Sequence, residues 1–174
     1  MNLSAENIAC RKALADEIIA LRALELRAGK PIDSARFQED NLDSTLHFGA
    51  WHQNLLIGCL TLIYSPEPGT DGHPIPSWQL RGMATASDWK RCGVGRTLLL
   101  FAETTLGHLA ETGWKKSNHV HPDYSSIIRV WCNARLAAVP FYKNSGYRIV
   151  SGLFHIERIG PHYKMEKILD VRNG

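Results

Sequence analysis

The stretch that decides the fold is KRCGVGRTLLLFAETTL, residues 90–106. It places Gly93 and Gly95 two residues apart, behind two cationic residues and at the beginning of a strongly apolar helix. Glycine is a poor helix former, so a glycine pair weakens the start of a helix. The pair therefore indicates either a tight bend of the backbone or a ligand that approaches the backbone closely.

A strand, a glycine turn and a helix in this order form a site for an anion. The first N–H groups of a helix have no intrahelical acceptor, and the helix dipole adds roughly half a positive charge there. A phosphate reaches these groups where no Cβ blocks the approach, and Lys90, Arg91 and Arg96 supply positive charge. The motif lacks the P-loop pattern and the third glycine of the dinucleotide fingerprint. A glycine pair needed only for packing is the alternative interpretation.

Composition indicates one soluble globular domain over residues 1–174, with 44% hydrophobic and 21% charged residues. The net charge of +3 is too small to indicate nucleic-acid binding, and apolar runs are too short to span a membrane. The N-terminus carries charges where a signal peptide needs an apolar core. Four scattered cysteines without CxxC pairing indicate a reducing compartment. We therefore expect a cytoplasmic protein.

Periodicity predicts helices, then antiparallel strands, then strand–helix–strand–helix and a closing hairpin, and hence an α/β or α+β fold with a mixed sheet. Expected helices are residues 11–26, 34–42, 96–109 and 135–145. Expected strands are Thr45–Trp51, Leu55–Tyr64, Trp78–Thr85, Ile127–Asn133, Tyr147–Ile156 and His162–Leu169, with a turn near residues 160–161. Residues rich in proline and glycine, 65–77, and residues 113–126 are expected to be loops.

Two motifs resemble the GNAT family of acyl-CoA-dependent N-acetyltransferases. The family signature Arg/Gln-x-x-Gly-x-Gly/Ala after a strand is matched by residues 90–95, with lysine in the first position. The stretch CNARLAAVPFYKNSGY, residues 132–147, is similar to a second family segment, and the resemblance covers nearly the whole chain. It implies a central mixed, mostly antiparallel sheet flanked by helices.

The resemblance also implies how acetyl-CoA binds. The pyrophosphate would lie on the N–H groups of residues 91–96, the pantetheine arm would pair with the backbone of residues 83–85, and Asn133, just past a strand, would contact the arm. The lysine in place of arginine gives up a forked donor and keeps the charge. The implied cofactor-binding residues are Met83, Ala84, Thr85, Lys90, Arg91, Cys92, Gly93, Val94, Gly95, Arg96 and Asn133.

Tyr142 falls where many family members hold a tyrosine that donates to the departing CoA sulfur, whereas a role as a core aromatic is the alternative. A phenol titrates near pH 10 and a thiol near pH 8.5, so full proton transfer is uphill by about 2 kcal/mol. Hydrogen-bond stabilisation of the thiolate is therefore the expected role.

The general base is left open by the sequence. Family members often use a glutamate on the strand that here reads WQLRGMAT, which offers Gln79 and Arg81 instead. His162 is the first candidate because the ordinary pKa of histidine suits proton removal near neutrality. A hairpin histidine without a catalytic role, or a chain of waters as the base, are the alternatives.

Two further patterns carry weaker signals. His119, His121 and Asp123 form an HxHxD cluster, which we interpret as solvated loop residues, and we expect no metal. Arg81 and Arg129 either pair with acidic groups of a substrate or lie on solvated strand faces.

The sequence thus predicts transfer of acetyl from acetyl-CoA to a primary amine of a small molecule or peptide, by direct attack in a ternary complex. No cysteine or serine has the histidine and aspartate that an acyl-enzyme nucleophile needs. The alternatives are an acyl-CoA-binding sensor or interaction module with the same fold, and a binder of nucleotide phosphates. The acceptor has no readable code, no membrane or nucleic-acid partner is expected, and a homodimer is compatible with the family.

Overall fold

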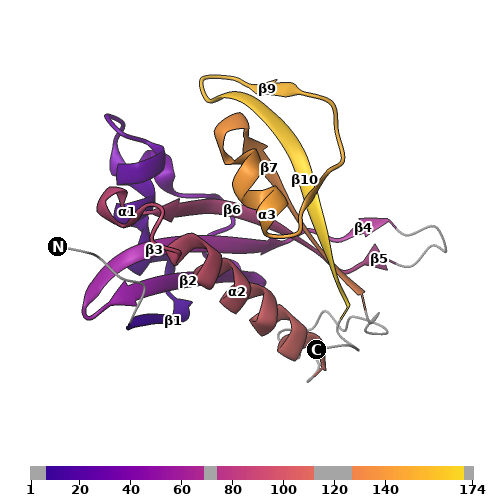
Figure 1. The fold of residues 1–174 in the computed structure, drawn as a ribbon, viewed down its shortest axis with the longest axis horizontal. Coiled ribbons are helices and arrows are strands. Elements are labelled where there is room, and N and C mark those ends of the chain that lie inside the picture. The colour runs from indigo at the N-terminus through magenta and orange to yellow at the C-terminus, as the bar shows by residue number, and fades with distance from the viewer. Residues whose placement is uncertain (1–6, 69–73, 112–126, 171–174) are drawn as a thin grey trace. The chain divides into compact units, whose positions relative to one another are not determined.

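The structure, a computed structural model, describes residues 7–68, 74–111 and 127–170 (Figure 1). In chain order the elements are β1 (Ile8–Ala13), α1 (Ala15–Leu26), a 3₁₀ helix (Ile32–Ala35), β2 (Thr45–His52), β3 (Leu55–Tyr64), β4 (Glu67–Pro68), β5 (Pro74–Ile75), β6 (Ser77–Thr85), a 3₁₀ helix (Ser87–Trp89), α2 (Val94–Glu111), β7 (Ile127–Arg135), a 3₁₀ helix (Leu136–Ala138), α3 (Val139–Asn144), β8 (Arg148–Ile149), β9 (Phe154–Ile156) and β10 (Gly160–Asp170).

The chain divides into two compact units, and β6 contributes residues to both. The first unit comprises residues 1–63, 81–106 and 115–120, and its strands are ordered β1-β2-β3-β6. The second comprises residues 64–80, 107–114 and 121–174, and its strands are ordered β6-β7-β10-β8, with β9 also on β10. β6 and β7 pair in parallel, whereas β1–β2, β2–β3 and the pairs of β10 are antiparallel. The predicted mixed, mostly antiparallel sheet is confirmed, and the single domain over residues 1–174 stays a prediction.

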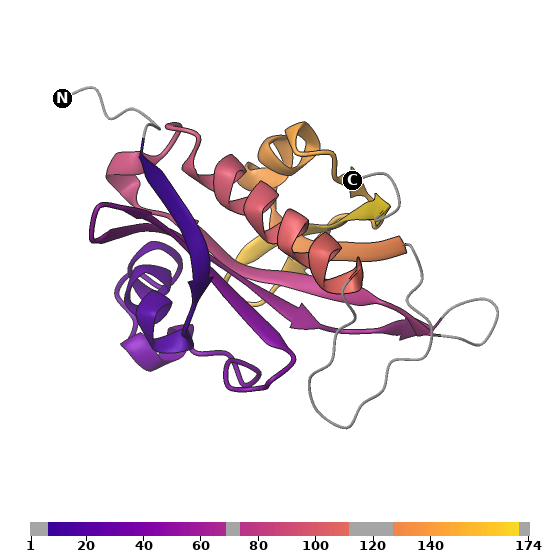
Figure 2. The same cartoon turned by 90° about the horizontal axis from the view of Figure 1, so that it is seen from below.

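In the first unit, α1 and α2 cover opposite faces of the sheet (Figure 2). A Cβ on Gly58 of β3 would lie 2.9 Å from Val94 Cγ1 of α2. The next residue, Cys59, instead belongs to a buried cluster with Ile18 and Leu21 of α1. Because successive side chains of a strand point to opposite faces, each helix covers its own face of β3.

A buried ion pair ties α1 to the segment that follows it. The guanidinium of Arg22 is 1% exposed, and its Nη1 donates to Asp40 Oδ2 at 2.8 Å and to the carbonyl of Ala35 at 3.0 Å. Its Nη2 donates to Thr61 Oγ1 on β3 at 2.6 Å. A buried charge is tolerated where it is paired with an opposite charge, as Arg22 is with Asp40. Arg22 therefore holds residues 35–40 against the sheet.

In the second unit, β7 shows a regular alternation of buried and more exposed residues. Ile128, Val130, Cys132 and Ala134 are buried, and the residues between them are not. On the other face, Arg129 forms ion pairs with Glu67 and with Glu166. Arg129 was expected either to contact a substrate or to be solvated. The structure shows instead that it forms ion pairs within the protein.

The N-terminal elements differ from the predicted ones. The helix expected at residues 11–26 begins at Ala15, because residues 8–13 form β1 along β2 and the Glu17 carboxylate accepts the Leu14 N–H at 2.7 Å at the helix start. Leu14, at this helix start, is 73% exposed. The helix expected at residues 34–42 is reduced to Ile32–Ala35. The rest of that segment is not helical, and the Asp40 carboxylate there accepts the Phe37 N–H at 2.8 Å.

The C-terminal half also differs in its boundaries. β7 runs on to Arg135, and α3 begins at Val139 because Pro140 fits only the first turn of a helix. The expected strand 147–156 is two short strands, β8 and β9, and the turn falls at residues 157–159, so Gly160 and Pro161 belong to β10. Asn133 lies within β7 rather than just past it.

Asp40→Ala should lower the free energy of unfolding by about 3–5 kcal/mol, because it leaves the charge of Arg22 buried without its partner. Urea denaturation followed by circular dichroism measures the loss. Asp16→Ala is the matched control, since Asp16 forms an ion pair with Arg36 in which its side chain is 81% exposed. Equal unfolding curves for the two variants would contradict the structural role assigned to Arg22.

Candidate active site

The backbone bends sharply before α2. Arg91 and Gly93 have φ angles of 65° and 81°, in the left-handed region that favours glycine. The turn is closed by a hydrogen bond from the Cys92 N–H to the Trp89 carbonyl at 3.4 Å, and the Thr97 N–H donates to the Gly93 carbonyl at 3.0 Å. A non-glycine residue with positive φ stores strain, which is common at ligand sites.

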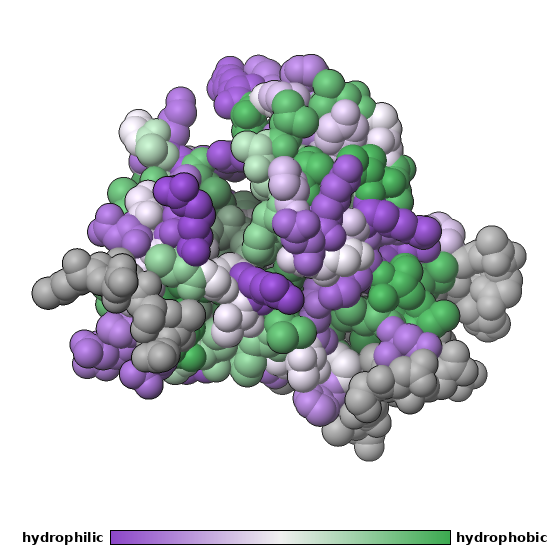
Figure 3. Space-filling view, in the orientation of Figure 1, coloured by the Kyte–Doolittle hydropathy of each residue, from purple (hydrophilic) through white to green (hydrophobic). Residues whose placement is uncertain are grey.

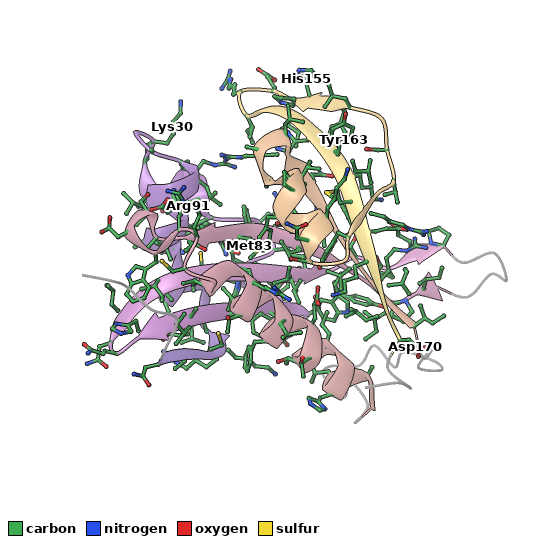
Figure 4. All side chains as sticks on the ribbon, in the orientation of Figure 1. Lys30, Met83, Arg91, His155, Tyr163 and Asp170 are labelled. Atoms are coloured by element: carbon green, nitrogen blue, oxygen red, sulfur yellow. The ribbon has the colours of Figure 1, made fainter. Side chains whose placement is uncertain are left out.

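The bend leaves a row of amides without acceptors. Within the part of the chain that the structure describes, no acceptor contacts the N–H groups of Arg91, Gly93, Val94, Gly95 and Arg96. Gly93 is exposed, whereas the Val94 side chain is 1% exposed and packs inward. Figure 3 shows strongly hydrophilic side chains gathered on this part of the face, and Figure 4 labels Arg91 there. The helix start thus offers backbone N–H donors next to the buried side chain of Val94.

Lys90 is directed away from this row by an ion pair. Its Nζ lies 2.8 Å from Glu25 Oε2, and Glu25 also accepts the Ser87 N–H at 2.9 Å and the Ser87 hydroxyl at 3.0 Å. Burial alone would raise the pKa of Glu25, but these hydrogen bonds outweigh it and lower the pKa. Glu25 therefore anchors the segment before α2, and the exposed Arg91 and Arg96 remain the cations nearest the amides.

The predicted pantetheine strand, Met83 to Thr85, is the end of β6 that leads into the bend. The parallel ladder between β6 and β7 comprises Ser77 to Gln79 of β6, so residues 83–85 lie beyond it. Ala84 is buried against α1, and Met83, labelled in Figure 4, is half-buried. These residues and the bend belong to the same unit.

Tyr142 and Cys132 form a pair in the second unit. The Tyr142 hydroxyl donates a hydrogen bond to the sulfur of Cys132 on β7. Burial raises the pKa of Tyr142 well above 10, and the Cys132 sulfur raises it further. The ring is 7% exposed and packs edge-on against Phe141 and Tyr147. Tyr142 is therefore a protonated hydrogen-bond donor that already faces a sulfur atom.

His162 and Asn133 occupy one face of the β7–β10 pair. His162 is 3% exposed, its Nδ1–H donates to the Gly160 carbonyl at 2.8 Å, and its ring stacks on Phe154 of β9. Asn133 is exposed and lies opposite Lys164 in the register. The structure thus packs His162 into the hairpin, and its role as a base stays a prediction.

The structure brings together residues 83–85 and 90–96 in the first unit, and Asn133, Tyr142 and His162 fall in the second. His119, His121 and Asp123 lie outside the described residues. Within the described ranges there is no group of three or more side chains suited to hold a metal ion, and no helix there is both long and apolar enough to cross a membrane.

Sequence reasoning missed three residues that shape this region: Glu25, Glu39 and Gly82. Glu25 and Glu39 meet partners 62 and 42 residues away, and nothing local in the sequence signals such contacts. Gly82 did carry a signal, because an isolated glycine inside a strand pattern indicates a bulge. Its φ of 59° lies in the left-handed region, which is compatible with such an irregularity of the strand.

Known proteins share this fold. The uncharacterised N-acetyltransferase YitI of Bacillus subtilis (strain 168) is 28% identical over 154 residues, which cover 88% of this chain and 91% of the relative. A Lactobacillus plantarum structure, provisionally assigned as an N-acetyltransferase, superposes with a TM-score of 0.64 at 21% identity over 94% of this chain and 99% of that chain. An aminoglycoside 6′-N-acetyltransferase complexed with coenzyme A gives 0.62 at 16% identity over 92% and 96%. No protein-family model matches the chain.

The fold class predicted from the sequence, that of the acyl-CoA N-acyltransferases, is therefore confirmed. The chain is thus similar to a curated N-acetyltransferase in sequence and to acetyltransferases in fold, as the two motifs predicted.

Cys59 and Cys132 should resist thiol reagents in the folded protein. Burial raises the pKa of each thiol to about 12, so at pH 8 roughly one molecule in ten thousand carries the reactive thiolate. Cys10 and Cys92 are half-buried and should react first. Mass spectrometry after timed alkylation with iodoacetamide identifies the modified residues, with guanidinium-unfolded protein as the control. Rapid labelling of Cys132 in the native state would contradict the burial of the Tyr142–Cys132 pair.

Proposed function

We propose that the protein transfers acetyl from acetyl-CoA to a primary amine by direct attack in a ternary complex, with residues 1–174 acting as one cytoplasmic domain. The row of amides at the start of α2 that meet no acceptor among the described residues carries this proposal. The absence of any disulfide among the four cysteines supports a reducing compartment.

The row of amides suits a diphosphate. Five N–H groups that meet no acceptor in the described ranges, together with the positive end of α2, favour an anion, and Gly93 itself has no Cβ to obstruct it. Arg91 and Arg96 add charge from the rim, whereas Lys90 acts through its ion pair with Glu25. Lys90, at the first position of the family signature, is therefore assigned to anchoring the loop rather than to contacting the diphosphate.

The pantetheine arm then follows β6. With the diphosphate at residues 91–96, the arm runs back along the chain from Thr85 to Met83 and pairs with their backbone as an added strand would. Its thioester end accordingly lies toward Gly82. Asn133 contacts the arm from β7 in the same proposal.

Chemistry proceeds by attack of the neutral amine on the thioester carbonyl carbon. The C–N bond forms, the C–S bond breaks, and the sulfur leaves with the bonding electron pair. Tyr142 stabilises the developing thiolate by donating a hydrogen bond, since its raised pKa makes complete proton transfer unfavourable. In this step the Tyr142 hydroxyl donates its hydrogen bond to the CoA sulfur in place of the Cys132 sulfur.

Free thiol released from acetyl-CoA with a panel of primary amines tests the function directly. Turnover that depends on an added amine is expected. Tight CoA binding with no thiol release from any amine would favour an acyl-CoA sensor instead.

Gly93→Asp should abolish CoA binding measured by isothermal titration calorimetry, because a carboxylate beside the amides repels the diphosphate and its Cβ fills the approach. Gly29→Asp is the matched control. Gly29 has a φ of 76°, and a Cβ added there would have nothing within 4 Å, so this variant reproduces the backbone strain away from α2. Retained affinity in Gly93→Asp would overturn the diphosphate site.

Tyr142→Phe should lower kcat roughly 10²-fold, the scale of one lost donor to a transition-state anion, with CoA affinity nearly unchanged. Steady-state kinetics and calorimetry on the same preparation separate the two effects. An equal loss of kcat and of CoA affinity would mean that the ring acts only in packing.

A further inference from the structure

Gly82 reverses the side-chain alternation of β6. Arg81 stacks its guanidinium on Phe37, 4.3 Å from the ring centroid, and Phe37 also stacks on Arg22 of α1. Ala84 packs in the cluster of Ile18 and Leu21, which also belong to α1. Residues three apart on a regular strand face opposite sides, so the positive φ of Gly82 marks a bulge that turns Arg81 toward the α1 face.

Position 82 also requires glycine because there is no space for a Cβ. A Cβ at position 82 would lie 2.8 Å from Arg22 Nε and 2.9 Å from Phe37 Cε2. The strand, α1 and the segment around Phe37 thus pack closely on one side of Gly82, the residue toward which the proposed thioester end of the arm runs.

Residues 35–40 present a carboxylate at this point. Arg22 holds the segment through Asp40 and the Ala35 carbonyl, and the carbonyl of Glu39 accepts the Thr45 hydroxyl at 2.7 Å. The Glu39 side chain reaches Arg81 with a single N–O distance of 3.5 Å. The two side chains are 35% and 36% exposed, so the ion pair is weak and an incoming cation can replace Arg81.

We propose that Glu39 binds the acceptor amine and removes its proton, an inference that rests on the acetyl-transfer function proposed above. Glu39 supplies the carboxylate that β6 itself lacks, from the segment after α1 rather than from the strand. The neighbouring acids are committed elsewhere, Asp40 to Arg22 and Glu25 to Ser87 and Lys90. The acceptor class is accordingly a cationic amine.

The proton balance is complete with these groups. The ammonium gives one proton to the Glu39 carboxylate, and its nitrogen then attacks the thioester carbonyl carbon. The C–N bond forms, the C–S bond breaks, and the second nitrogen proton ends on the departing sulfur to give free CoA thiol. Glu39 returns its proton to water. The charged groups around Glu39 in this step are Arg81 on β6, Arg22 on α1, Asp40 beside it and His47 of β2, whose Nε2–H donates to the Asp40 carbonyl.

Glu39→Gln tests the proposal with an amine found active on the wild-type enzyme. At pH 7 its kcat/KM for the amine should fall about 100-fold or more, with the KM for acetyl-CoA unchanged. Its rate should keep rising with pH where the wild type levels off, because free amine then replaces the lost base. Glu39→Asp should recover part of the rate.

Asp43→Asn is the matched control, since Asp43 is exposed in the same segment and should keep wild-type kinetics. Thermal unfolding of each variant verifies folding. A Glu39→Gln enzyme within twofold of wild type, or loss of the plateau in His162→Gln instead, would overturn the role of Glu39 while leaving acetyl transfer intact. No thiol release by the wild type with any amine would overturn both proposals.

Discussion

The ion pair of Arg22 with Asp40 is the interaction on which the first unit depends most. A guanidinium that is 1% exposed is costly to bury unless its charge is paired, and here Asp40 pairs it while both terminal nitrogens of Arg22 donate hydrogen bonds. Asp40 and the Ala35 carbonyl come from the segment after α1, and Thr61 comes from β3. Their convergence on one side chain fixes α1, the segment after it and β3 in a single arrangement.

The bend before α2 draws its rigidity from packing of a different kind. Val94 is buried against Gly58, and Leu98 follows it into the same face of β3. Because Gly58 has no side chain, α2 approaches the strand closely, and its first turn cannot move without opening the core. The donors that face outward are therefore held by side chains that face inward. A site for an anion needs this preorganisation, since flexible amides would lose entropy on binding.

The bend was predictable from sequence because its chemistry is local. Two glycines, flanking cations and an apolar helix lie within seventeen residues, and unpaired amides are a property of any helix start. The antiparallel pair β2–β3 and the positions of β6 and β7 along the chain followed from periodicity and turn residues in the same way. The features that were not predicted depend on contacts between distant residues. β1 forms because it pairs with β2. Glu25 and Glu39 contact residues of β6 and of the segment after it. Asp40 shortens a helix that local propensity favours, because a buried arginine elsewhere needs its carboxylate.

In the proposed chemistry, the departure of the CoA sulfur and the deprotonation of the amine are linked through the phenol of Tyr142. Burial and the Cys132 sulfur raise the pKa of that phenol, so it is a good donor of a hydrogen bond and a poor source of a proton. The proton that the thiol finally carries must then come from the attacking nitrogen. An alkyl ammonium holds one proton more than the reaction can place on sulfur, and that proton needs an acceptor near the nitrogen before attack begins. A half-exposed carboxylate such as Glu39 meets this requirement, because it attracts the cation and exchanges its proton with water. In the proposed mechanism the two groups therefore serve separate steps, with Tyr142 stabilising the leaving sulfur and Glu39 taking the proton that the nitrogen loses before attack.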